Sequence, residues 1–252
     1  MVCPRGHAFD IARSGYINLL QPADRHSRNA GDSKEAVQAR ARLAAAGVGD
    51  RVFAQLADRI SAFLPGDHAC VIDLGCGPGE ALDAVSRRRR ITGIGIDLSS
   101  SAADYAARRF PALIWIVANA DRRLPVLTGS ASLIMSLNGR RNPEECARVL
   151  RAEGYLVVSV PGPDDLIELR ERVQGTSIER DRSITVLADH SNGFELIERM
   201  SLRQRQVLAR ESLLDLLRGT YRGRRTSQSA AVDSLESLEL TLAQEVLVFR
   251  VK

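Results

Sequence analysis

An acid followed by three alternating glycines is the stretch of this sequence best suited to binding a ligand. Asp73 is followed by glycines at positions 75, 77 and 79, and residues without side chains let the chain turn tightly and let backbone N–H groups approach a ligand. A pyrophosphate-binding turn would have the spacing G-x-G-x-x-G and no acid beside it. The alternating glycines and the carboxylate instead predict a site for a positively charged ligand. The alternative is a tight turn that binds nothing.

A second acid follows at the distance that one helix and one strand require. Residues 70–74 are typical of a buried strand, a helix is expected from Glu80, and a second apolar strand over 91–96 leads into Asp97, 18 residues beyond Gly79. Parallel strands present their carboxyl ends at one edge of the sheet. We therefore expect Asp73 and Asp97 to lie close together at that edge.

Alternating apolar runs and amphipathic stretches must position these acids. Apolar strands separated by helices predict a doubly wound, mostly parallel sheet of the α/β class. Ser33 and Asp50 are expected to cap the first two helices. We expect helices over 34–46, 51–64, 80–87, 101–109, 143–151, 164–174 and 211–218. We expect strands over 70–74, 91–96, 113–117, 131–137 and 155–160, closed by a hairpin of 194–208 and 238–251.

The composition limits the classes of partner. The 252 residues carry a net charge of +4, and all but two of the 35 basic residues are arginines. Arginine suits phosphate and base contacts, which favours an RNA partner, although a GC-rich genome would produce the same bias. The cysteines, Cys3, Cys70, Cys76 and Cys146, contain no C-x-x-C pair, and no apolar run reaches the length of a membrane span. We expect a cytoplasmic protein with no disulfide framework and no membrane partner.

Several blocks resemble one family, in the same order along almost the whole chain. The D-x-G-x-G-x-G turn followed by Asp97 is similar to class I S-adenosylmethionine-dependent methyltransferases. More specific are Gly15-Tyr-Ile-Asn-Leu-Leu20, Gly31-Asp32, Ala39-Arg40 and Pro161-Gly-Pro163. Together they resemble the bacterial 23S ribosomal RNA guanine-N1 methyltransferases, a group that includes macrolide-resistance enzymes.

The resemblance implies a seven-stranded, Rossmann-like class I methyltransferase fold with a short irregular N-terminal extension. It implies S-adenosylmethionine as cofactor, ribosomal RNA as partner, methyl transfer to N1 of a guanine and a connection with antibiotic resistance. A small-molecule methyltransferase on the same fold, and a relic that binds RNA or a partner without catalysis, are the alternatives. A homodimer is one assembly that the sequence allows.

The resemblance also implies a set of cofactor-binding residues. Asp97 would bind the ribose, Asn119 would accept a hydrogen bond from the adenine amino group, and Asn138 would face cofactor and substrate. For Asn138, a turn residue before Gly139 is nearly as good an interpretation. The full set is Asp73, Gly75, Cys76, Gly77, Pro78, Gly79, Asp97, Leu98, Asn119, Ala120 and Asn138.

An RNA substrate would require phosphate contacts and a proton acceptor. The expected basic face consists of Arg25, Arg28, Arg40, Arg140 and Arg141, with Arg122, Arg123, Arg222, Arg224 and Arg225 beside them. Guanine N1 carries a proton that must leave, which calls for a general base or a water path. Asp121, Glu144 and Asp165 are the candidates by location, although such acids are more often solvated surface residues.

The chain departs from the family pattern at its N-terminus. Family members carry a zinc ribbon, of which Cys3 and His7 match the second half while the first cysteine pair is lacking. Structural zinc needs four ligands, and these two residues supply only half of them. The alternatives are therefore a zinc site completed by other residues and an N-terminal segment with a free thiol. Gly49 and Asp165 stand where the family has an aromatic residue and a histidine, which predicts a lower cofactor affinity.

These observations divide the chain into two expected parts. Residues 1–32 form a degenerate ribbon-like arm, and residues 33–252 form the methyltransferase domain. Within that domain, 33–66 are N-terminal helices, 67–174 the cofactor-binding core and 175–252 the C-terminal part.

Overall fold

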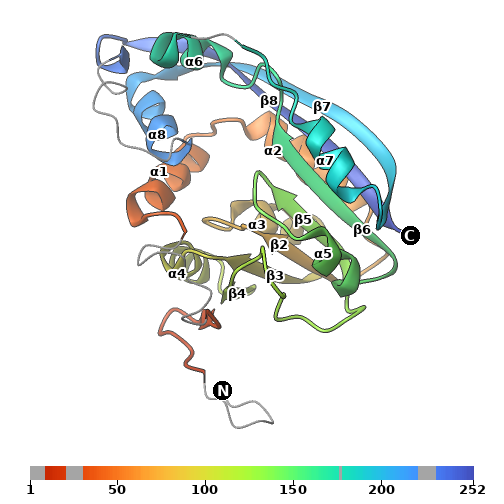
Figure 1. Cartoon of the computed structure of the whole chain (residues 1–252). Helices are drawn as coiled ribbons and strands as arrows, with labels where there is room; N and C mark the ends of the chain where they lie inside the picture. Colours follow the sequence, from red (N-terminus) through yellow and green to blue (C-terminus); the bar gives the residue numbers. More distant parts are fainter. Residues whose placement is uncertain (1–8, 21–30, 176–177, 221–230) are drawn as a thin grey trace.

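The computed structural model describes residues 9–20, 31–175, 178–220 and 231–252. These residues form an eight-stranded sheet in the order β1-β4-β3-β2-β5-β6-β8-β7 (Figure 1). Strands β1 to β6 run parallel to their neighbours in that series, and β8 is antiparallel to both β6 and β7. The predicted doubly wound, mostly parallel fold is therefore confirmed, with one strand more than expected.

The elements alternate along the chain as the hydrophobic pattern predicts. The strands are β1 Ile17–Asn18, β2 Ala69–Leu74, β3 Ile91–Asp97, β4 Ile114–Val117, β5 Ala131–Leu137, β6 Leu150–Pro161, β7 Phe194–Ala209 and β8 Ser237–Val251. The helices are α1 Lys34–Ala45, α2 Asp50–Ala62, α3 Glu80–Arg88, α4 Ser100–Arg109, α5 Pro143–Val149, α6 Ile167–Gln174, α7 Ser183–His190 and α8 Arg210–Thr220. The β7–β8 hairpin forms one long edge of the molecule (Figure 1).

Helices cover both faces of the sheet because the central strands are apolar on both sides. On one face, apolar residues of α2, α3 and α4 pack against alternate residues of β2, β5 and β6. On the other face, α5 and α7 pack against the residues in between. Helices α1 and α8 pack against each other in a third apolar cluster that includes Leu43 and Leu213. None of the helices in the described residues has the length and apolar character needed to cross a membrane.

Four local features differ from the sequence-based expectation. The short strand β1 pairs with the edge strand β4, so part of the N-terminal extension belongs to the sheet. Helix α7 was missed altogether. Helix α5 ends at Val149 because Leu150 is already extended and pairs with Ala131 of β5. Ser33 caps α1 as expected, but the cap of α2 is Gly49, in the left-handed conformation, and Asp50 is the first helical residue.

Candidate active site

A glycine turn between β2 and α3 is held against the end of β3 by hydrogen bonds. Gly75 N donates to Ile96 O at 2.8 Å. Gly77 N donates to Oδ2 of Asp97 at 2.8 Å, and Oδ1 of the same carboxylate accepts from Ser99 N at 2.8 Å. Through these two hydrogen bonds the buried carboxylate of Asp97 joins the turn to the β3–α4 loop. Each of its oxygens keeps a further lone pair for a second donor.

Close packing explains why side chains are missing from this turn. Gly79 has φ +95°, and a Cβ added there would lie 2.6 Å from the ring of Trp115. A Cβ on Gly75 would lie 3.1 Å from Cα of Gly139, so the loop after β5 touches the turn. Between the glycines, Cys76 and Pro78 are buried. The turn therefore offers main-chain atoms to a ligand.

Asp73 lies near the end of β2, where it is buried and its Oδ1 has no hydrogen-bond partner among the described residues. Burial, and after it the neighbouring charge of Asp97, together raise the pKa of Asp73 to about 8. Burial also raises the pKa of Asp97, against the hydrogen bonds from Ser99 and Gly77. A buried polar atom without a partner is costly. A ligand that brought a donor or a positive charge would remove that cost, so the site fits a cationic cofactor.

The segment after β4 borders a cavity on the side expected for adenine. Oδ1 of Asn119 accepts from Asp121 N at 3.0 Å and keeps a second lone pair. A cavity of about 290 Å³ is lined by Leu19, Ala118, Asn119, Arg122, Arg123 and Pro125. On the ribose side, Gly31 packs against the backbone of Leu98 and Ser99. Ala120, which follows Asn119, is partly exposed.

The backbone of Asn138 has the conformation of a turn residue. Its φ is +59°, a left-handed conformation that asparagine tolerates better than most residues. Its N–H donates to Ser159 O of β6 at 2.8 Å. Since Gly139 touches Gly75, Asn138 stands at the rim of the glycine turn.

The expected RNA-binding arginines occupy different environments. Arg40 lies beside the glycine turn, with Nη1 2.5 Å from Oδ2 of Asp32. Arg141 is held inside the fold, where Nε donates to Nε2 of His190 at 3.2 Å and burial lowers the pKa of its guanidinium. Arg140 is 76% exposed and pairs with Asp121. Arg122 and Arg123 line the cavity beside Asn119. Arg25, Arg28, Arg222, Arg224 and Arg225 lie outside the described residues.

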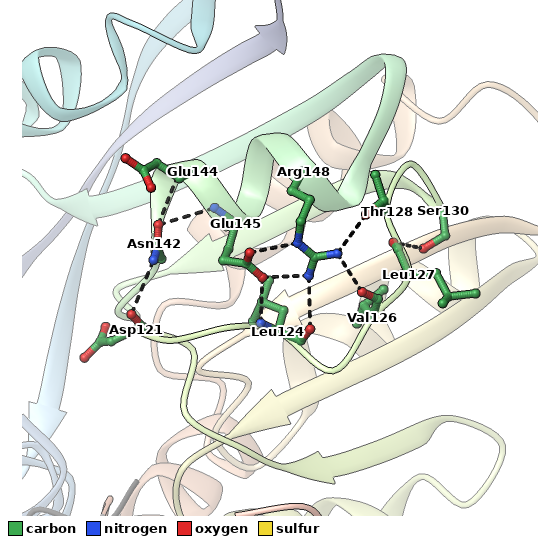
Figure 2. Close-up of polar contacts among 10 residues, drawn as sticks. All are labelled: Asp121, Leu124, Val126, Leu127, Thr128, Ser130, Asn142, Glu144, Glu145 and Arg148. Carbon is green, nitrogen blue, oxygen red and sulfur yellow. Dashed lines mark hydrogen bonds and ion pairs between the residues drawn. The ribbon is translucent and has the colours of Figure 1, made fainter. Parts of the chain in front are cut away.

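An ion pair on α5 braces the loop between β4 and β5 (Figure 2). Arg148 donates to both carboxylate oxygens of Glu145 at 2.8 and 2.6 Å, which lowers the pKa of Glu145. The same guanidinium donates to the carbonyls of Leu124 and Val126, and Glu145 accepts from Leu124 N at 2.8 Å. The sequence analysis did not single out this pair. The Glu-x-x-Arg spacing on a helix was the available signal.

The candidate proton acceptors are spread around the edge of the sheet. Asp121 pairs with Arg140, and Glu144 is exposed at the start of α5. Asp165 accepts a hydrogen bond from Ala243 N at 2.8 Å, and burial raises its pKa to about 6.

The zinc expectation concerns residues that the structure does not describe. Cys3 and His7 both lie outside the described residues. Within the described residues, no group of three or more histidine, cysteine, aspartate or glutamate side chains could hold a metal ion.

The chain is similar to known methyltransferases. The family model described as "Methyltransferase domain" matches residues 71–154, and the one described as "RlmA, N-terminal", a zinc ribbon, matches residues 1–28. Two solved structures share the fold at a TM-score of 0.56. One is a Bacillus halodurans protein assigned as a methyltransferase, with 16% identity over 78% of this chain and 97% of that chain. The other comes from a complex of the Haloferax volcanii Trm112 activator with a methyltransferase, with 21% identity over 87% and 97%.

Curated relatives show the family. A Micromonospora griseorubida protein assigned as a 23S rRNA (guanine-N(1)-)-methyltransferase is 32% identical over 85% of this chain and 77% of its own length. The 23S rRNA (guanine(748)-N(1))-methyltransferase of Streptomyces fradiae is 36% identical over 66% of this chain and 59% of its own length. The chain therefore belongs to the 23S rRNA (guanine-N1)-methyltransferase family, whose members are S-adenosylmethionine-dependent enzymes of the class I fold.

Proposed function

We propose that this protein transfers a methyl group from S-adenosylmethionine to N1 of a guanine in 23S ribosomal RNA. The observation that carries the proposal is the pair of buried acids beside the glycine turn. Asp97 holds two loops together, and Asp73 lies next to it with one oxygen, Oδ1, that has no partner in the part of the chain that the structure describes. The target is supported by relatives that are named for this reaction on this RNA.

In the proposed complex, each part of the site has a separate task. The glycine turn lies along the methionyl part of the cofactor, Asp97 accepts hydrogen bonds from the ribose hydroxyls, and Asn119 faces the adenine. The cofactor supplies a methyl group on a positively charged sulfonium. The protein contributes position: it aligns the target nitrogen with the methyl group in a site that excludes water. In this proposal Asn138, at the rim of the turn, faces the target base.

The arginines beside the cavity favour RNA over a small molecule as substrate. A small substrate would be expected in a closed, mainly apolar cavity. The cavity next to Asn119 is instead bordered by Arg122 and Arg123, and Arg140 stands exposed on the following loop. Guanidinium groups at the mouth of a site suit the phosphates of an RNA strand that crosses it.

The test is methylation of unmodified 23S ribosomal RNA by the purified protein with labelled S-adenosylmethionine. Digestion to nucleosides and mass spectrometry should reveal N1-methylguanosine, and primer extension should stop at the modified nucleotide because N1 is needed for base pairing. Asp97→Ala should lose this activity, whereas Asp58→Asn, an exposed change on α2, should keep it. Label found only in another nucleoside, or no transfer to RNA by a protein that binds the cofactor, would contradict the proposal. A homodimer is a separate prediction, tested by light scattering.

A further inference from the structure

Arg40 of α1 lies against the glycine turn and is held there by two other segments. Its Nη1 is 2.5 Å from Oδ2 of Asp32, and its Nε and Nη2 both donate to Gly219 O, at 3.0 and 2.8 Å. A Cβ added to Gly77 would lie 3.9 Å from Nη1. The guanidinium therefore lies on the side of the turn to which a side chain at Gly77 would point, at the distance of a van der Waals contact with its Cβ.

Asp32 is anchored to the same backbone that Asp97 holds. Its carbonyl accepts from Oγ of Ser99 at 2.7 Å, and a Cβ added to Gly31 would lie 2.6 Å from Ser99 N. Asp97 itself binds Ser99 N and Gly77 N. The pair of Asp32 and Arg40 is thus built onto both loops that frame the cofactor site. Consistent with this proximity, their charges act in opposite directions on the pKa of Asp97.

The guanidinium keeps donors for a ligand. Arginine has five N–H groups, and the contacts to Asp32 and Gly219 use one each on Nε, Nη1 and Nη2. Counting only contacts with described residues, one hydrogen on Nη1 and one on Nη2 remain. The side chain of Arg40 is 38% exposed, so a ligand can reach these donors. Three fixed contacts set their direction in advance, which lowers the cost of binding a planar anion.

We infer that Arg40 binds the α-carboxylate at the amino-acid end of the cofactor, and that Asp32 is the positioning residue that orients its guanidinium. This inference rests on the proposed cofactor site. A carboxylate needs a positive partner, and the acids at this turn, Asp73 and Asp97, cannot provide one. Arg40 is then a cofactor-binding residue and not the RNA contact that its sequence context predicts.

The test compares two ligands, S-adenosylmethionine and its decarboxylated analogue, by calorimetry. The wild-type protein should prefer the complete cofactor by roughly 10- to 100-fold, the range expected for a hydrogen bond between charged groups. Arg40→Met should bring that preference close to one, while the analogue binds as it does to wild type. Arg40→Lys should retain part of the preference, since the charge remains without the fork. Asp32→Asn should reduce it less than Arg40→Met does.

Arg42→Met is the matched control, because Arg42 lies on the same helix and pairs with Asp215 of α8. It should keep the wild-type preference. Equal weakening of both ligands by Arg40→Met would show a structural clamp, and an unchanged preference with lost RNA affinity would show an RNA contact; either result overturns the inference. If the Met variant does not fold, a wild-type preference retained by Arg40→Lys and Asp32→Asn alike overturns it. Failure of the wild-type protein to bind either ligand would instead contradict the cofactor site itself.

Discussion

The buried carboxyl of Asp73 should make the stability of this protein depend on pH in a measurable way. Burial and the nearby Asp97 raise the pKa of Asp73 to about 8, whereas an aspartate in an unfolded chain titrates at about 3.9. The folded state therefore binds a proton that the unfolded state releases. Stability from this group is fully present below about pH 3.9 and is lost as the pH rises towards 8.

In the window from pH 6.5 to 8 an unfolded aspartate is already ionised, whereas Asp73 in the folded protein still releases its proton. Asp165, with its pKa raised to about 6, has largely titrated below that window. Burial lowers the pKa of His190, so its unfolded form, which titrates at about 6.5, loses the rest of its proton in this window, and stability from this group rises with pH, opposite to Asp73. Across this window the proton linkage of Asp73 amounts to roughly 1.5 to 2 kcal/mol of lost stability. For a chain of this size that is a fall in Tm of about 3 to 8 °C.

The assay is thermal unfolding of the wild-type protein and Asp73→Asn across this window, without cofactor. The asparagine keeps the shape of the side chain and cannot ionise, so its Tm should change less with pH, and the two curves should converge towards low pH. Asp58→Asn makes the same change at an exposed site on α2 and should leave the wild-type slope intact. Parallel curves for wild type and Asp73→Asn would refute the reasoning.

Three further predictions test the packing and the bracing of the site. Gly79→Ala puts a Cβ against the ring of Trp115 at a residue whose φ is left-handed. The substitution should lower the free energy of unfolding by more than about 2 kcal/mol, which is the size of an overpacking effect. Gly129→Ala, also at positive φ but with open space around it, should cost only about 1 kcal/mol; equal losses in chemical unfolding would contradict the packing argument. Arg148→Met should speed amide hydrogen exchange in the loop that the ion pair braces. It should also weaken cofactor binding, although Arg148 itself makes no contact with the cofactor in the proposed complex. Unchanged exchange would contradict the bracing role of Arg148. Asp97→Asn leaves one backbone N–H facing an amide donor and should lower the free energy of unfolding by about 1 to 3 kcal/mol, as measured by thermal melting. It should also weaken recognition of the ribose, as measured by adenosine binding.

Much of the framework could be predicted from the sequence because its signals are local. The strand β5 over 131–137 was predicted at its observed bounds, and the serine cap of α1 at Ser33 is confirmed. Apolar runs of β2 and β3, each leading to an acid, also placed Asp73 and Asp97 at one edge of the sheet. A strand buried on both faces is an unbroken apolar run, and a cap is a matter of three or four residues.

Features that depend on distant segments were decided by the tertiary structure. The two residues of β1 are too few to show a period, and they form a strand only because β4 offers a free edge. Arg40 and Arg141 look alike in sequence, but one is directed to the glycine turn by Asp32 and Gly219, and the other inward by His190. The burial that leaves Oδ1 of Asp73 without a partner among the described residues likewise arises from the packing around it. Residue type sets what a side chain can donate or accept, whereas the segments that the fold brings beside it set its direction and its charge.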